Sequence, residues 1–144
     1  MHHAIKEGAD ARNAMQVGID KAVNLVRFTV GVKGRNIILD TNEYADPVNT
    51  NDGISVLMEL KFEDYYENVG LKKVREVAEK INDIAGDGTS SGSVVYQTIF
   101  GEGNKAINNG ADSIAIRRGI NEATKTIIKL VDNDTVKISD LKSL

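Results

Sequence analysis

The sequence contains no cysteine, and its only two histidines are His2 and His3. Without cysteine, disulfide bonds and thiolate metal sites are excluded. Without an internal histidine or any cysteine, catalytic triads of the Ser-His-Asp and Cys-His kinds are excluded as well. The terminal histidines could form a weak surface metal site, but a segment without function, such as a cloning remnant, is the simpler interpretation. Any chemistry must therefore rest on carboxylates, hydroxyls, backbone amides, lysines or a bound metal.

Long apolar runs and an excess of positive charge are also missing. No stretch approaches the roughly 18 uninterrupted apolar residues that a membrane span needs, and the first residues contain no apolar core of a signal peptide. The formal net charge is −3, so no basic field marks a nucleic-acid partner. We therefore expect no membrane and no nucleic-acid partner, with the cytoplasm as the default location.

The residues that are present predict a mainly helical domain. A length of 144 residues suits one domain, and a hydrophobic content of 41% is enough to form a core. Apolar residues recur at helical spacing in four segments, which are residues 10–30, 63–84, 88–107 and 113–131.

A small β-hairpin is predicted between the first two helical segments. Residues 36–40 and 47–50 have strand-like composition, and the polar residues between them form a turn. Pro47 begins the second strand, where a proline removes no ladder hydrogen bond. A short segment, residues 54–60, follows the hairpin, and Asn51 or Asp52 can cap it. The predicted fold class is thus mainly α with a β-hairpin over residues 37–50.

The turn at residues 85–91, with the sequence AGDGTSS, has the composition of a phosphate site. Its glycines let a ligand approach the backbone, and the helix that follows begins with unpaired N–H groups that attract phosphate. Asp87 is tolerable beside phosphates only if a cation lies between them, and Mg²⁺ takes one or two carboxylates plus phosphate oxygens. The alternative is that Asp87 and Thr89 merely cap a helix. The turn is not a Walker A loop, because no Gly-Lys-Ser/Thr follows.

Two further turns are similar in kind. Residues 29–36 form a glycine loop with two cations at the end of a helix, and residues 50–53 form an acidic turn before a helix. Each could be only a helix stop or a cap. Three glycine-containing turns in one helical chain are better explained by one composite site than by three unrelated helix stops or caps.

The order of these turns resembles the N-terminal half of the equatorial, ATP-binding domain of the GroEL-like chaperonins. The family's three signatures appear here as TVGVKGRN at residues 29–36, TNDGISV at 50–56 and GDGTSS at 86–91. The resemblance extends over about residues 8–131. Arg35 and Asn36 are typical of the bacterial and organellar group, whereas Asn51 is similar to the archaeal and eukaryotic cytosolic group.

The resemblance implies a set of residues that contact ATP, namely Thr29, Val30, Gly31, Asp52, Gly53, Asp87, Gly88, Thr89, Ser90 and Ser91. Asp87 would coordinate Mg²⁺, and residues 88–91 would hold the β- and γ-phosphates. Residues 29–31 would contact the α-phosphate and help to bind K⁺, a second candidate ion. Asp52, near the γ-phosphate with Gly53, would be the catalytic residue that helps to orient the attacking water.

The resemblance also implies partners. The hairpin resembles the stem loop that pairs with a terminal strand of a neighbouring subunit in a ring homo-oligomer. Unfolded client proteins would bind an apical domain that is missing here, and a co-chaperonin is a further candidate partner. Val32 replaces the family's proline, Asn51 replaces a lysine, and Ser90 and Ser91 replace threonines.

The length of the chain leads to two hypotheses of function. Residues 1–133 are predicted to be the N-terminal segment of an equatorial domain, and residues 134–144 the start of an intermediate domain or a tail. The first hypothesis is a fragment of an ATP-hydrolysing chaperonin subunit. Such a fragment is expected to be inactive by itself and to expose apolar faces made for the missing half. The alternative is a chaperonin-derived helical assembly module without ATP turnover.

Overall fold

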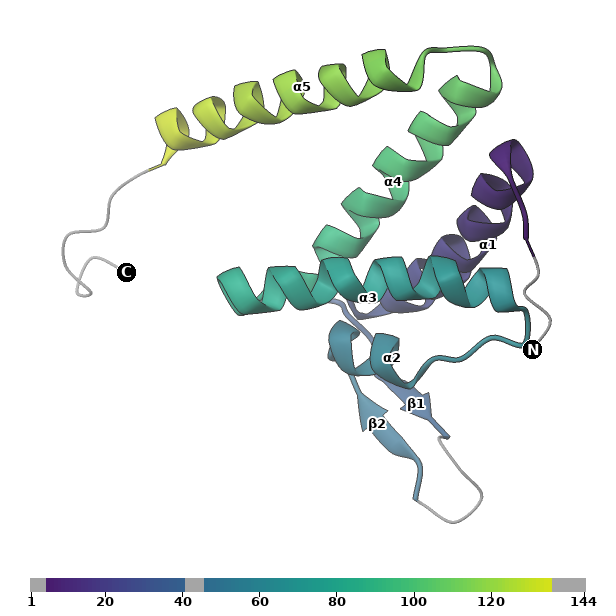
Figure 1. Ribbon diagram of the computed structural model, residues 1–144. Coiled ribbons are helices and arrows are strands. Elements are labelled where there is room, and N and C mark those ends of the chain that lie inside the picture. The colour runs from purple at the N-terminus through teal and green to yellow at the C-terminus, as the bar shows by residue number, and fades with distance from the viewer. Residues whose placement is uncertain (1–4, 41–45, 136–144) are drawn as a thin grey trace. The chain divides into compact units, whose positions relative to one another are not determined.

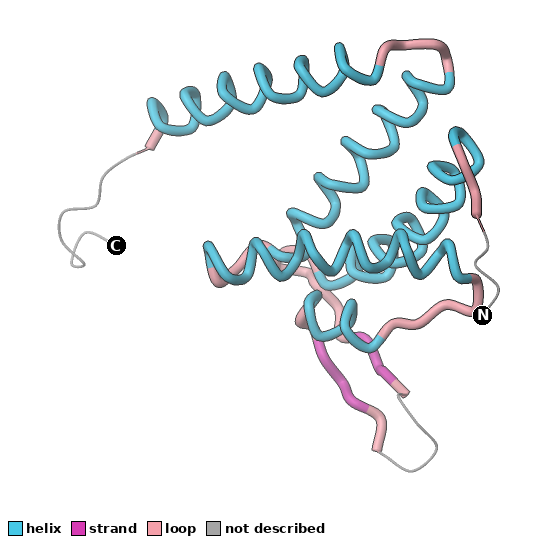
Figure 2. The backbone as a smooth tube through the Cα atoms, viewed as in Figure 1, coloured by secondary structure: helices cyan, strands magenta, loops and turns pink. Residues whose placement is uncertain are grey.

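The computed structural model describes residues 5–40 and 46–135, and within them helices dominate (Figures 1 and 2). The mainly helical fold class with a small β-hairpin is confirmed. The chain divides into two compact units, Met1–Lys105 and Ala106–Leu144. The described elements are, in order, α1 (Gly8–Val26), the 3-10 helix η1 (Arg27–Thr29), β1 (Ile37–Leu39), β2 (Val48–Thr50), α2 (Gly53–Glu59), α3 (Tyr65–Ala85), α4 (Thr89–Asn108) and α5 (Ser113–Asp134).

The core of the first unit lies where α1, α2 and α3 meet. Each helix buries an apolar stripe at helical spacing, and the fully buried side chains are Ile19, Ala22, Val23, Val26, Val56, Leu57, Leu71, Val74 and Ala78. Helices α1 and α3 approach backbone to backbone, because a Cβ built on Gly18 would lie 2.0 Å from the Glu67 carbonyl oxygen. A Cβ on Gly70 would lie 2.2 Å from the Met15 carbonyl oxygen.

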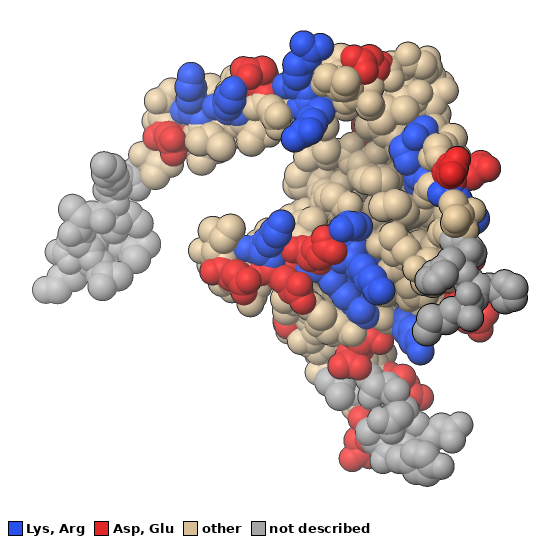
Figure 3. Space-filling model, viewed as in Figure 1, with Lys and Arg blue, Asp and Glu red and all other residues tan. Residues whose placement is uncertain are grey.

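The buried face of α3 differs in part from the predicted one, which was Tyr66, Val69, Val74, Val77, Ala78, Ile81 and Ile84. Val74 and Ala78 are buried as expected, whereas Ile84 is 87% exposed. Gly70 and Leu71 lie in the buried stripe instead. The outer surface of α3 carries Lys, Arg, Asp and Glu side chains of both signs next to one another (Figure 3), including the ion pair of Lys73 with Glu76 at 2.9 Å.

The helix ends follow simple local chemistry. Asp52, Asp64 and Asp112 cap α2, α3 and α5, each accepting hydrogen bonds from two backbone N–H groups of the first turn. The first predicted helix ends earlier than residue 30, since α1 stops at Val26 and continues as η1. The helical path ends one residue before the predicted stop, because Val30 is already extended with a φ of −75° and a ψ of 133°. Gly31 follows with a φ of +79°.

The hairpin pairs β1 and β2 antiparallel, with Ile37 opposite Thr50 and Leu39 opposite Val48. Ile37 and Leu39 pack against the core, while Ile38 between them is 72% exposed. This alternation is the period of two expected for a strand with one buried face. The tip of the predicted hairpin, residues 41–45, lies outside the described residues, as do His2 and His3.

Helix α4 begins at Thr89, as predicted, and passes through its interior glycines without a break. Its predicted apolar face, Val94, Val95, Thr98, Ile99 and Ile107, is only partly correct. Val94 packs against the core, whereas Val95 is 57% and Ile99 46% exposed. The aromatic residues Tyr96 and Phe100 also pack against the core and are partly buried.

The second unit contains α5, which starts at the predicted Ser113 and ends at Asp134. None of its residues is buried. In the part of the chain that the structure describes, no helix is both long and apolar enough to cross a membrane. The boundary expected between residues 133 and 134 stays a prediction, since residues 136–144 lie outside the described part.

Candidate functional site

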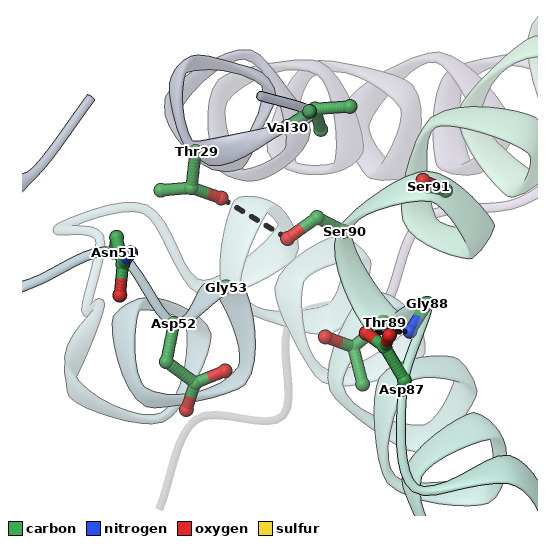
Figure 4. Close-up of a pocket in the computed structure, with 11 residues that line it drawn as sticks. Thr29, Val30, Asn51, Asp52, Gly53, Asp87, Gly88, Thr89, Ser90 and Ser91 are labelled. Atoms are coloured by element: carbon green, nitrogen blue, oxygen red, sulfur yellow. Dashed lines mark hydrogen bonds between the residues drawn. The ribbon is translucent and has the colours of Figure 1, made fainter. Parts of the chain in front are cut away.

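A pocket of about 180 Å³ forms where three turns of the first unit meet (Figure 4). One wall is the end of η1 and the residue pair after it, a second is the turn before α2, and a third is the turn that leads into α4. The lining comprises all ten residues singled out in the sequence and one more, Asn51: Thr29, Val30, Gly31, Asn51, Asp52, Gly53, Asp87, Gly88, Thr89, Ser90 and Ser91. Sequence motifs that are far apart along the chain are therefore parts of one site.

Asn51 is the lining residue that was not placed in the site from the sequence. It precedes Asp52 in the second turn, so its position next to a candidate residue was the available signal. The loop cations Lys33 and Arg35, in contrast, do not line the pocket.

A hydroxyl pair joins the first and third walls of the pocket. Thr29 Oγ1 lies 3.0 Å from Ser90 Oγ (Figure 4). Thr29 Oγ1 also donates to the Val26 carbonyl oxygen at 2.8 Å. Since a hydroxyl has one proton, Ser90 must be the donor to Thr29. The Ser90 hydroxyl thus holds the first turn of α4 against the end of η1. This contact does not use the backbone N–H of Ser90.

Gly53 lets the second wall approach the third. A Cβ built on this buried residue would lie 2.1 Å from Ser90 Oγ and 2.9 Å from Val26 Cγ1. Both distances are inside van der Waals contact, so a side chain at this position would displace the Ser90 hydroxyl from its place beside Thr29 and press on Val26 of α1. Glycine is required here by the close approach of two helix ends.

The carboxylate of Asp52 is fixed by its role as the cap of α2. Oδ1 accepts from Ile54 N at 3.3 Å, and Oδ2 accepts from Ser55 N at 3.2 Å and from Ser55 Oγ at 2.6 Å. A carboxylate offers about four acceptor positions, so these three bonds do not exhaust it. Capping and a role in the pocket are therefore compatible at Asp52.

Asp87 does not act as a cap in this way. Its Oδ1 accepts from the adjacent Gly88 N at 2.6 Å, and within the described residues no side chain accepts from Ser90 N or Ser91 N. The described hydrogen bond of Asp87 is thus made to the residue next to it and not to the first turn of α4. Since the first N–H groups of a helix have no partner inside the helix, α4 presents open donors and the positive end of its dipole at the pocket. Aspartate covers these donors at α3 and α5, whereas the N-cap of α1, Glu7, forms no side-chain capping hydrogen bond.

The charge of the pocket lining is negative. It includes two carboxylates, Asp52 and Asp87, and no lysine or arginine. In the ranges 5–40 and 46–135 no group of three or more His, Cys, Asp or Glu side chains could hold a metal ion alone. A cation bound here would need further ligands from the molecule that it accompanies, which is how Mg²⁺ is usually held beside phosphates.

A comparison with known protein families identifies the class to which this fold and site belong. The TCP-1/cpn60 chaperonin family matches residues 23–144, which is well over half of the chain. The chain therefore belongs to the TCP-1/cpn60 chaperonin family. Membership implies a chaperonin-like role and assembly with other chaperonin subunits, and it confirms the family resemblance of the three motifs. The match does not separate the bacterial-type group from the others.

Proposed function

We propose that the pocket binds the phosphates of Mg-ATP, and that the chain is part of a chaperonin subunit that hydrolyses ATP to drive protein folding. The observation that supports this most is the convergence of all three motif turns on one pocket. Family membership makes the same function the expected one.

The donors and acceptors of the pocket suit a metal-bound polyphosphate. The open N–H groups at the start of α4, over residues 89–91, would bind phosphate oxygens. Two carboxylates without a cationic side chain beside them would repel a bare polyphosphate. A cation is therefore needed between the carboxylates and the phosphates. Asp87, which accepts only one described hydrogen bond, would be the protein ligand of Mg²⁺, and residues 29–31 would contact the α-phosphate and K⁺.

The fixed carboxylate of Asp52 gives it a distinct role in the proposal. Its three hydrogen bonds to α2 hold it in one orientation at the wall opposite Asp87. An acceptor held in this way can orient a water molecule for attack on the terminal phosphate. When bound, Mg²⁺ would neutralise the charge of the phosphates.

The size of the pocket limits what this chain does alone. A volume of about 180 Å³ is below the roughly 300–1,000 Å³ of sites that enclose drug-sized ligands. The pocket therefore suits the phosphates rather than a whole nucleotide. By itself the 144-residue chain is expected to bind ATP without appreciable hydrolysis. The alternative, an assembly module without ATP turnover, leads to the same expectation about hydrolysis. Steady phosphate release at the rate of an intact chaperonin ring would contradict this expectation.

Partners and group follow from the same proposal. A two-stranded hairpin is marginal in isolation, so β1 and β2 would gain stability by accepting a strand of a neighbouring subunit in a ring homo-oligomer. Client proteins and a co-chaperonin would bind a longer protein that includes an apical domain. Arg35 and Asn36 support the bacterial-type group, and Asn51 is the departure from it.

Calorimetric titration of the chain with ATP, with and without Mg²⁺, tests the site. Asp87→Asn should weaken binding in the presence of Mg²⁺ by about tenfold or more, the usual size for loss of support to a bound metal. Asp83→Asn is the matched control, because Asp83 is an exposed aspartate at the end of α3 that does not line the pocket. Binding that is independent of Mg²⁺, or equal in Asp87→Asn and the unaltered chain, would refute the assignment.

A further inference from the structure

Helix α4 is joined to α1 and η1 by a ladder of polar side chains. On α4 the ladder residues are Ser90, Gln97 and Asn104, spaced by seven residues, which is close to two helical turns. They lie on one face of the helix and belong to the same compact unit as α1. The first rung is the contact of Ser90 with Thr29 at the pocket.

The middle rung is the contact of Gln97 with three side chains. Gln97 Nε2 donates to Asp20 Oδ1 at 2.7 Å and lies 3.5 Å from Asn24 Oδ1. Gln97 Oε1 accepts from Arg27 Nη2 at 2.9 Å. The side-chain amide of Gln97 therefore binds residues on successive turns, from the second half of α1 to the start of η1. Both its NH2 group and its carbonyl oxygen form hydrogen bonds.

The last rung is the contact of Asn104 with the beginning of α1. Asn104 Oδ1 accepts from Arg12 Nε at 3.1 Å, and Asn104 Nδ2 donates to Asn13 Oδ1 at 3.0 Å. Asn104 is buried. The ladder therefore extends from one end of α1 to the other.

Gln16 occupies the space between the middle and last rungs. Its Nε2 donates to Asp20 Oδ1 at 3.0 Å, so that oxygen accepts from both helices. Gly101 lies opposite, and a Cβ built on it would be 3.4 Å from Gln16 Nε2. The Gln16 amide therefore lies within ordinary van der Waals reach of α4 at this point.

The other contacts of α4 are less directional. Val94, Tyr96 and Phe100 pack against the core, and apolar packing tolerates small shifts better than hydrogen bonds do, because it is non-directional. Hydrogen bonds demand a distance and an angle. The polar ladder thus restricts the shift and turn of α4 relative to α1 more tightly than these apolar contacts do.

We propose that Gln97 is a positioning residue that fixes the register of α4 against α1 and η1. By doing so it holds Ser90 against Thr29 and keeps the open N-terminus of α4 at the pocket. Gln97 does not line the pocket itself. The consequence for ligand binding rests on the proposed function, whereas the consequence for the contact of Ser90 with Thr29 does not.

Gln97→Glu tests the proposal, because it keeps the length of the side chain and its acceptor for Arg27 but places a carboxylate against Asp20. Mg-ATP binding should weaken by about tenfold, as for loss of other supporting contacts around a bound metal. NMR cross-peaks between the Thr29 methyl group and the Ser90 β protons should weaken in the ligand-free chain. Gln97→Met, which is neutral and of similar size, should have the same effect if the charged variant fails to fold.

A compensating change distinguishes positioning from a general loss of stability. In the double variant Gln97→Glu with Asp20→Asn, the NH2 group of the new Asn can donate to the new carboxylate. Its second proton can bind Gln16 Oε1, which has no partner within the described residues, once the Gln16 amide turns over. The rung is then restored with the donor reversed. Affinity and cross-peaks should both return. Thr98→Ala is the control that should change neither, since Thr98 is exposed and its hydroxyl donates to Val94 O within α4.

Each outcome decides the proposal. Unchanged cross-peaks in Gln97→Glu and Gln97→Met would overturn it, as would failure of the double variant to restore them. If the unaltered chain does not bind Mg-ATP, the proposed function fails while the cross-peaks still test the role of Gln97.

Discussion

Asp64, at the start of α3, combines capping with charge. Its Oδ1 accepts from Tyr66 N at 2.8 Å and from Glu67 N at 3.0 Å. The hydrogen bond from Glu67 N is the main cause that lowers the pKa of Asp64 below its usual value. Partial desolvation opposes this, and the bond from Tyr66 N and the charges of Lys6 and Lys21 add to it.

The stability of α3 should therefore depend on acid pH through Asp64. A pKa that is lower in the folded state stabilises the fold above the unfolded value of about 3.9, and this contribution is lost as pH falls toward the folded value. Asp64→Asn keeps a capping side chain but removes the titration. Its melting temperature should be lower than that of the unaltered chain at pH 7, and the difference should shrink at about pH 3.

Asp83→Asn is the matched control for this measurement, because Asp83 accepts no hydrogen bond within the described residues. A difference between Asp64→Asn and the unaltered chain that is the same at neutral and acid pH would contradict the role of the Asp64 charge.

At the site, the residue types were predictable and their contacts were not. Asp87, its neighbouring glycines and the hydroxyls after them could be selected from the sequence because their chemistry suits a phosphate and a metal. The contact of Ser90 with Thr29 could not, because the two residues are 61 positions apart. The same holds for Gly53. A side chain at this position would collide with Ser90, and this becomes visible only where α2 meets α4.

At the scale of elements, the crossing of α1 and α3 depends on two glycines. Gly18 and Gly70 each lie against the backbone of the other helix. The sequence showed helices with glycine inside them, where this residue lowers helix propensity. The crossing explains why they are tolerated, since only glycine allows so close a contact.

Gly18→Ala should destabilise the chain by about 1–3 kcal/mol, the usual cost of inserting atoms into a packed interface. Urea unfolding followed by circular dichroism measures the change. Gly119→Ala is the control, because Gly119 is inside α5 and a Cβ there would meet nothing within 4 Å. That substitution should raise helix stability by about 0.5–1 kcal/mol. Equal effects of the two substitutions would show that the crossing does not depend on Gly18.

Helix boundaries were predicted more successfully than helix faces. Turn composition and the onset of apolar periodicity are local signals, and they placed the starts of α4 and α5 correctly. The buried faces of α3 and α4 were only partly predicted, because periodicity identifies an apolar stripe but not the direction from which a neighbour approaches. Leu71, Tyr96 and Phe100 face the core for that reason.

At the scale of the whole molecule, α5 exposes a row of apolar side chains. Ile120, Ile127 and Val131 lie on one face and are 38%, 58% and 59% exposed. Exposed apolar surface of this kind promotes association. We therefore expect the chain to self-associate as its concentration rises. The sequence leads to the same expectation, because it predicts helices with apolar faces that need a packing partner.

Ile127→Glu should reduce this association, because it places a charge in the apolar row. Thr126→Glu adds the same charge at the neighbouring exposed position outside the row and should have little effect. Sedimentation velocity over a range of concentrations compares the two variants. Equal association of both would show that the α5 row is not responsible.

The sequence by itself determined the helical class, the helix starts, the hairpin strands and the residue types of the candidate site. These depend on periodicity, caps and turn chemistry, which act over a few residues. Tertiary structure alone decided that three distant turns line one pocket, that Ser90 binds Thr29 and that Gln97 joins α4 to α1. Those contacts arise from the packing of whole helices, whose directions are set by the shapes of buried side chains and by glycines that let backbones touch.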